Sequence, residues 1–112
     1  MKRLIPLLVA VLLILSACSK GAPEGMSKDA YKYGSKALEI LKDFNDGKIS
    51  GSDASSRLTD LSQKITNLES GDQYYKDPIL AGQINIANLA VSNFRNYNAY
   101  DEQEDLEELL GK

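Results

Sequence analysis

Apolar residues recur along most of this chain at steps of three and four, the spacing that predicts amphipathic helices. Three long segments carry this pattern, within residues 27–45, 50–69 and 77–97, and short polar breaks containing glycine separate them. Short connections between helices favour antiparallel neighbours. The pattern therefore predicts an all-α fold, a three-helix antiparallel bundle over residues 27–100.

The first segment has a broad apolar stripe and ends at Asp46-Gly47, where glycine is a natural helix stop. The stripe is wide enough to contact two neighbours. Its members are Ala30, Tyr33, Gly34, Ala37, Leu38, Ile40, Leu41 and Phe44.

The second segment begins at Ser50, which fits a capping box together with Asp53. It has a narrow apolar seam and a polar opposite face, and it ends before Gly71. The seam consists of Ala54, Leu58, Leu61, Ile65 and Leu68.

The third segment has Asp77 as its predicted N-cap and Pro78 at the first helical position, where proline is tolerated. Apolar residues cover most of its circumference, so we expect this helix in the middle of the bundle. They are Ile79, Leu80, Ile84, Ile86, Ala87, Leu89, Ala90, Val91, Phe94 and Tyr97.

The last segment, residues 101–112, is an acidic tail. Asp101 and Glu104 offer a cap pair for a short helix, and three leucines give it a small apolar edge. Its six acidic side chains repel one another. We therefore expect this short helix to fray or to dock only weakly.

The start of the chain has the features of a secretory signal peptide. Lys2 and Arg3 precede an uncharged apolar run that ends at Ala17. The run is shorter than the roughly 18 residues that a membrane-spanning helix needs. Cleavage and export are the predicted fate of this segment.

The motif Leu15-Ser16-Ala17-Cys18 resembles the lipobox of bacterial lipoproteins. The resemblance implies cleavage between Ala17 and Cys18 and a lipid on the Cys18 thiol. Residues 1–17 would then be the signal peptide, and residues 18–26 a lipid-anchored tether. The protein would lie at the outer face of the cytoplasmic membrane, or at the outer membrane of a Gram-negative cell. The alternative is an ordinary signal peptide that leaves Cys18 as a free or intermolecular thiol.

The charge balance argues against nucleic acid as a partner. The chain has 13 Lys and Arg against 16 Asp and Glu, a net charge of −3. Nucleic acids are bound mainly through basic side chains at phosphates. The membrane is the predicted partner through the lipid on Cys18 alone.

The residue types needed for common catalytic and metal sites are missing. The chain has no histidine and one cysteine, which the lipobox assigns to lipid. An EF-hand alignment on Gly47 places Lys42 and Phe44 where calcium needs oxygen ligands. We therefore expect no enzyme activity, no metal and no cofactor.

Six tyrosines form the remaining candidate site, as aromatic contacts for a partner or as caps on a small core. They are Tyr31, Tyr33, Tyr74, Tyr75, Tyr97 and Tyr100. With the predicted anchor, they suggest a non-catalytic interaction module that binds an envelope or secreted protein. One alternative is a small-ligand or glycan binder with a pocket between the first and third helices. Another is a lipoprotein of phage exclusion or immunity.

Overall fold

The structure is a computed structural model. It describes residues 21–69, 71–93 and 98–112. The predicted signal peptide, its cleavage site at Ala17 and Cys18, and the candidate residue Tyr97 lie outside these residues.

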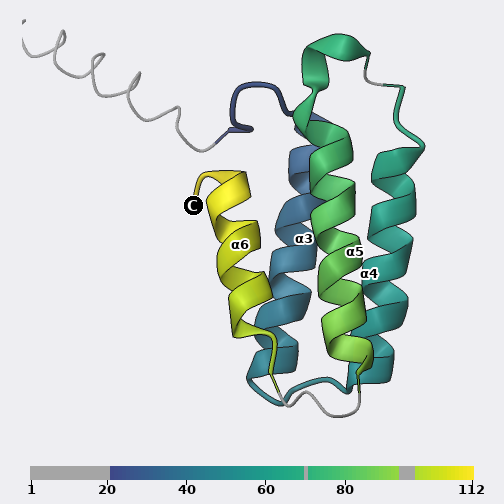
Figure 1. The fold of residues 1–112 in the computed structure, drawn as a ribbon, viewed down its shortest axis with the longest axis vertical. Helices are drawn as coiled ribbons and strands as arrows, with labels where there is room; N and C mark the ends of the chain where they lie inside the picture. The colour runs from purple at the N-terminus through teal and green to yellow at the C-terminus, as the bar shows by residue number, and fades with distance from the viewer. Residues whose placement is uncertain (1–20, 70, 94–97) are drawn as a thin grey trace, which may run out of the picture.

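Within the described residues the fold is all-helical, as predicted, and contains no strand. The elements are α3 (Lys28–Asn45), α4 (Gly51–Thr66), the short 3-10 helix η2 (Asp72–Tyr74), α5 (Lys76–Ser92) and α6 (Tyr100–Leu110). Successive α-helices run in opposite directions along one long axis (Figure 1). The architecture is thus an antiparallel bundle in which four α-helices are described.

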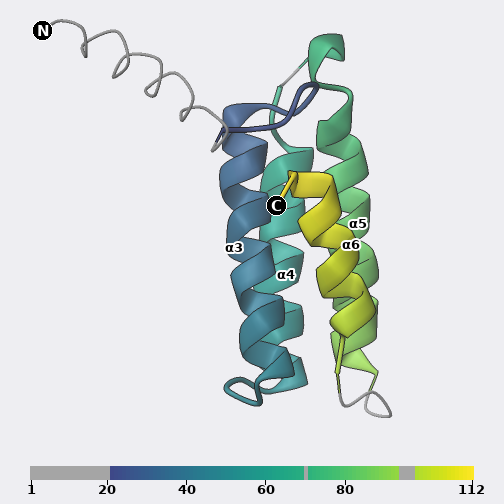
Figure 2. The same cartoon turned by 90° about the vertical axis from the view of Figure 1, so that its left-hand side faces the viewer.

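Two helices share the middle of this bundle. Helices α3 and α5 contact each other, and each of them also packs against both α4 and α6. Helix α4 covers one side of this pair and α6 covers the other (Figure 2). The expectation that the third predicted helix alone is central is therefore corrected, because α3 contacts as many helices as α5 does.

The predicted helix ends at the α3–α4 connection are confirmed. Gly47 has a φ of +76°, and the Lys48 amide donates to the Asp43 carbonyl at 2.8 Å. Such a left-handed glycine with a back-reaching amide satisfies the last free carbonyls of a helix. Ser50 then caps α4, because its hydroxyl accepts from the Asp53 amide at 3.1 Å.

Asp77 does not cap its own helix, contrary to the prediction. Helix α5 begins at Lys76, two residues before the predicted first helical residue Pro78, and its N-cap is Tyr75. The Asp77 carboxylate instead accepts from the amide and the hydroxyl of Ser27, at 2.8 and 2.6 Å. Ser27 is the N-cap of α3, so Asp77 joins the starts of two helices that are far apart in sequence.

The acidic C-terminal segment forms a fourth helix that packs against the bundle. This corrects two expectations, that the bundle has three helices and that the acidic tail frays or docks only weakly. Leu106 and Leu110 of α6 are 0% and 2% exposed. The Leu110 side chain packs over Gly34 of α3, so closely that a Cβ at Gly34 would lie 2.9 Å from one of its methyl groups. The acids lie mostly on the exposed side of α6, where solvent weakens their repulsion.

Polar side chains hold the start of this fourth helix. The Asn45 side chain at the end of α3 donates to Gln103 at 2.7 Å and accepts from the Ala99 amide. Helix α6 therefore begins at Tyr100 without the predicted Asp101 cap, because the neighbouring α3 supplies a polar partner.

The core fills the space between the helices with small and medium aliphatic residues. The buried members are Met26, Ala30, Ala37, Leu38, Leu41, Ala54, Leu58, Leu61, Ile65, Leu80, Ala81, Ile84, Ala87, Val91, Ala99, Leu106 and Leu110. The predicted stripes of α3 and α4 supply eight of these 17 residues and α5 supplies five, while Phe44 and Leu68 are only partly buried.

Candidate functional site

The six tyrosines do not form one surface. Tyr31, Tyr74 and Tyr75 lie near the end of the bundle where the described chain begins, whereas α6 starts with Tyr100 at the opposite end (Figures 1 and 2). Tyr75 and Tyr100 are exposed, and the other described tyrosines are partly buried. The predicted partner surface is therefore divided between two ends of the molecule.

Two partly buried tyrosines of α3 have lysine ammonium groups from other parts of the chain close to their rings. The ammonium group of Lys112 lies 5.3 Å from the centre of the Tyr31 ring. Lys64 of α4 lies 5.8 Å from the centre of the Tyr33 ring. These contacts resemble cation–π pairs on the bundle surface and assign both tyrosines a role in packing.

The chain before α3 packs against the bundle. Met26 is buried, and the Gly25 carbonyl accepts from the Lys76 amide at 2.8 Å. The Tyr75 ring lies so close to Gly25 that any Cβ there would clash with it. Gly25 and Met26, which were predicted to belong to a tether over residues 18–26, are thus part of the folded unit.

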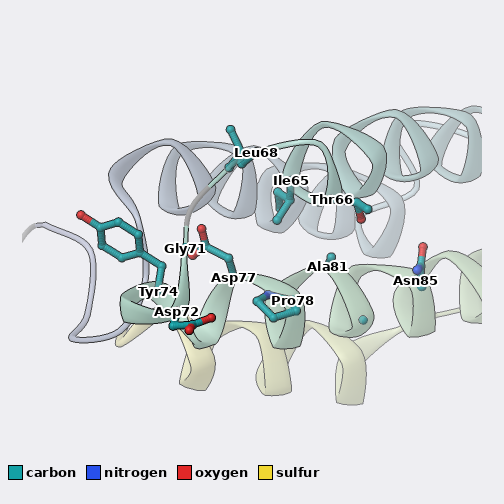
Figure 3. A pocket seen from close by; sticks show the side chains of 11 residues that line it. Ile65, Thr66, Leu68, Gly71, Asp72, Tyr74, Asp77, Pro78, Ala81 and Asn85 are labelled. Atoms are coloured by element: carbon teal, nitrogen blue, oxygen red, sulfur yellow. The ribbon is translucent and has the colours of Figure 1, made fainter.

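A groove of about 540 Å³ lies beside these residues, between the end of α4 and the start of α5. In Figure 3, Ile65 and Leu68 line one wall, Pro78 and Ala81 line the other, and Tyr74 stands at the end. The groove is partly open to solvent. It has the volume of a ligand site without the enclosure that such sites usually have.

Asp77 lines this groove but is 3% exposed, and its carboxylate is held by Ser27. A buried carboxylate must be hydrogen-bonded or lose much of its favourable hydration. These bonds assign Asp77 a structural role, and we do not count it among candidate catalytic groups.

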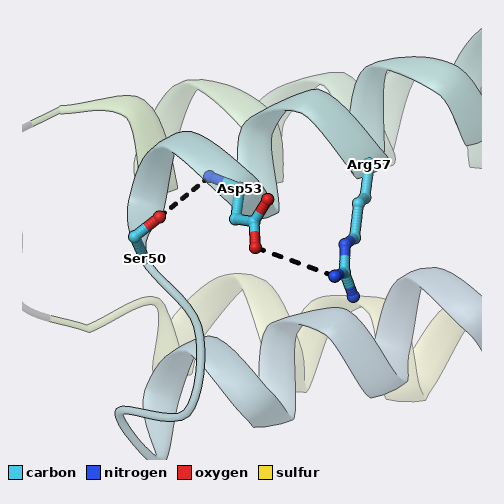
Figure 4. A network of polar contacts seen from close by, with 3 residues as sticks. All are labelled: Ser50, Asp53 and Arg57. Carbon is cyan, nitrogen blue, oxygen red and sulfur yellow. Dashed lines mark hydrogen bonds and ion pairs between the residues drawn. The ribbon is translucent and has the colours of Figure 1, made fainter.

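The segment that resembled an EF-hand loop is the capped turn between α3 and α4. The Asp53 amide donates to Ser50, and its carboxylate lies 3.7 Å from the Arg57 guanidinium (Figure 4). In the part of the chain that the structure describes, no group of three or more His, Cys, Asp or Glu side chains is placed to hold a metal ion.

The most unusual surface is the solvent face of α5. Ile79, Ile86 and Leu89 are 53%, 52% and 72% exposed. After Asp77 the helix carries no charged residue, and its exposed positions also include Pro78, Gly82, Asn85 and Ser92. An apolar, uncharged helix face in water is typical of a surface that a partner covers.

Sequence reasoning assigned all of these apolar residues to the core. The opposite face of α5 is the buried one, through Leu80, Ala81, Ile84, Ala87 and Val91. In a bundle this small, even a helix that contacts all the other described α-helices keeps one face in solvent, because its neighbours cover only part of its circumference. The available signal was the apolar pattern on both faces, which exceeds what one small core covers.

Small polar residues explain how α5 packs closely against α4. Asn88 donates to Thr59 at 2.8 Å, and Ser55 hydrogen-bonds to Asn88. Ser62 donates to the Ala81 carbonyl at 3.3 Å. The predicted polar face of the second helix is thus partly an interface.

None of the helices over residues 21–69, 71–93 and 98–112 combines the length and the apolar character needed to cross a membrane. No protein-family model matches the chain, and no curated protein or solved structure does.

Proposed function

We propose that this protein is a lipid-anchored, non-catalytic interaction module of the cell envelope. The lipobox-like motif ending at Cys18 supports the anchor. The uncharged solvent face of α5, with Ile79, Ile86 and Leu89 exposed, supports the interaction and is the observation that carries the proposal. The absence of histidine from the sequence argues against the commoner hydrolytic mechanisms.

The anchor would hold the bundle close to the membrane. Met26 is buried and Ala22 is partly buried against the core. Even if the chain between Cys18 and Ala22 were fully extended, its four steps would span at most ~14 Å. Two or more acyl chains would make such attachment stable.

Metabolic labelling with a fatty-acid analogue tests the anchor. We expect the wild-type chain to be labelled and to sediment with membranes, and the Cys18→Ser variant to be unlabelled and released. Label on both proteins would contradict the lipid assignment.

Capture from intact membranes tests the interaction. We expect proteins captured by the wild-type chain to be lost with Leu89→Glu, which places a charge on the exposed face of α5. The matched control, Ser56→Glu, adds the same charge at an exposed position of α4. Equal capture by both variants would contradict a role for the α5 face.

A small-ligand or glycan binder is the second candidate, supported by the groove below Tyr74. Tyrosine offers a flat apolar ring and a hydroxyl, which suit a sugar face. Titration of the protein with a glycan panel tests this candidate. Binding that Tyr74→Ala abolishes would favour it over a protein partner.

A further inference from the structure

Exposed residues of α5, together with Tyr75 just before it, follow the spacing of a coiled-coil seam. Tyr75, Ile79, Gly82, Ile86 and Leu89 are separated by steps of four, three, four and three. All five are exposed. This spacing places Ile79 and Ile86 at one core position of the heptad, and Tyr75, Gly82 and Leu89 at the other. We call these five residues the α5 seam.

We propose that the α5 seam binds the α5 seam of a second copy of this chain, in parallel, as a two-fold dimer. The inference rests on the proposed role as an interaction module and names its partner. Isoleucine at both first core positions, followed by Leu89 at the last of the second ones, favours two parallel strands over larger assemblies.

The charges of the surface favour a second copy at this face. Every exposed residue of α3 is charged, and the exposed positions of α6 after Tyr100 are acidic. In a two-fold dimer each helix face meets the same face of the second copy. The exposed face of α3 has more lysines than acids and that of α6 is acidic, so each of these faces would repel its own copy. The exposed positions of α5 carry no charge, so this is the helix face at which two copies approach without repulsion.

Gly82 lies in the middle of the α5 seam and leaves room for close approach. A Cβ at this position would meet no heavy atom within 4 Å beyond its chain neighbours and the adjacent backbone of its own helix. Glycine at a helix crossing lets two backbones come nearer than larger residues allow. The position also accepts a larger side chain without disturbing the monomer.

The parallel direction follows from where the chain enters the bundle. The Gly25 carbonyl is bonded to the Lys76 amide, so the N-terminal segment lies beside the start of α5. Two copies attached to one membrane through this segment present their α5 helices in the same direction. Each residue of the α5 seam then faces the same residue of the second copy.

The size of the seam predicts a weak dimer in solution. Helix α5 has 17 residues and is about 25 Å long. Two such helices bury less than the ~800 Å² per partner of a standard stable interface. Attachment to one surface raises the effective concentration without adding contacts. The dimer should therefore form on membranes at expression levels at which the released protein is monomeric.

Disulfide trapping in the full chain on isolated membranes tests this dimer. We expect Leu89→Cys to give a covalent dimer upon mild oxidation, because facing core positions bring two Cα atoms within disulfide range. The matched control is Gln63→Cys, an exposed position of α4 that faces away from the core of the bundle. Its dimer yield should be at least tenfold lower. Equal yields from the two variants would overturn the proposal.

A charge in the seam provides the second measurement. Gly82→Glu, combined with Leu89→Cys, should reduce trapping at least tenfold because two carboxylates would face each other. Ser56→Glu in the same background should leave the yield unchanged. Circular dichroism checks that both variants are folded. Unchanged trapping with Gly82→Glu would contradict the seam.

The wild-type chain separates failure of the dimer from failure of the anchor. Trapping of the wild type through Cys18 would show that this thiol is free and would contradict the lipid proposal. The seam is then tested by the same variants in a Cys18→Ser background at high protein concentration. Absence of the Leu89→Cys dimer there would overturn the dimer independently.

Discussion

The solvent-exposed faces of α3 and α5 differ in charge at every exposed position. The exposed positions of α3 are all charged: Lys28, Asp29, Lys32, Lys36, Glu39 and Lys42. The exposed positions of α5 are all uncharged: Pro78, Ile79, Gly82, Asn85, Ile86, Leu89 and Ser92. The two helices occupy equivalent central places in the bundle. The packing of the monomer alone does not require this difference, which is what the proposed partner at the α5 face would explain.

The largest expected effect separates the two faces of α5. Ile84 is 0% exposed and Ile86 is 52% exposed. We expect Ile84→Ala to lower the free energy of unfolding by about 2–5 kcal/mol, because it removes buried methyl groups and leaves a cavity. Ile86→Ala should cost less than about 1 kcal/mol in the monomer. Urea denaturation of the released domain measures both, and equal losses would show that Ile86 belongs to the core.

The next effect concerns the bond that joins the starts of α3 and α5. We expect Asp77→Asn to cost about 1–3 kcal/mol, because the charged acceptor of two Ser27 hydrogen bonds is lost at a buried site. Asp72→Asn is the control, since Asp72 is exposed. Thermal unfolding compares the two variants. Similar melting temperatures of the two variants would show that the Asp77 carboxylate does not stabilise the contact between α3 and α5.

Two glycines give effects of opposite sign in the same pair of helices. A Cβ on Gly34 of α3 would lie 2.9 Å from a methyl group of Leu80 and from one of Leu110, and both leucines are buried. We expect Gly34→Ala to destabilise the fold by about 1 kcal/mol through overpacking, even after the gain in helix propensity.

The Gly82→Ala variant should instead stabilise the monomer by up to about 1 kcal/mol, because the new methyl group meets nothing. Denaturant midpoints of the two alanine variants give the signs directly. Destabilisation by Gly82→Ala would mean that this face of α5 is not open in the monomer.

The smallest effect concerns the charged faces. Arg57 and Asp53 form an ion pair at 3.7 Å with both side chains about half exposed (Figure 4). We expect Arg57→Gln to change the stability by at most about 0.5 kcal/mol, and by less at high salt. A larger loss of stability that does not depend on salt would show that the charged faces contribute to the stability of the fold.

Local signals predicted the helices well because the chain itself supplies them. Ser50 caps α4 and Gly47 ends α3 through bonds within a few residues. The apolar stripes of α3 and α4 were identified because each faces the core on one side only. Such features depend on spacing along the chain, and spacing is visible in the sequence.

Features that depend on distant contacts were missed. Asp77 looked like a cap for its own helix, yet its partner Ser27 is 50 residues away. The acidic segment looked unstable because its support, Gly34 and Asn45, belongs to another helix. The tyrosines looked like one candidate surface, and the fold places those that are described at two ends.

The sequence by itself determined the helical periods, the helix stops and the motif that points to lipid on Cys18, because each is a property of neighbouring residues. The tertiary structure alone decided which face of α5 is buried, that α6 packs as a fourth helix, and where the tyrosines lie. The physical reason is that burial is shared between segments. One small core covers a single face of each helix, and only the arrangement of all helices determines which apolar face remains in water.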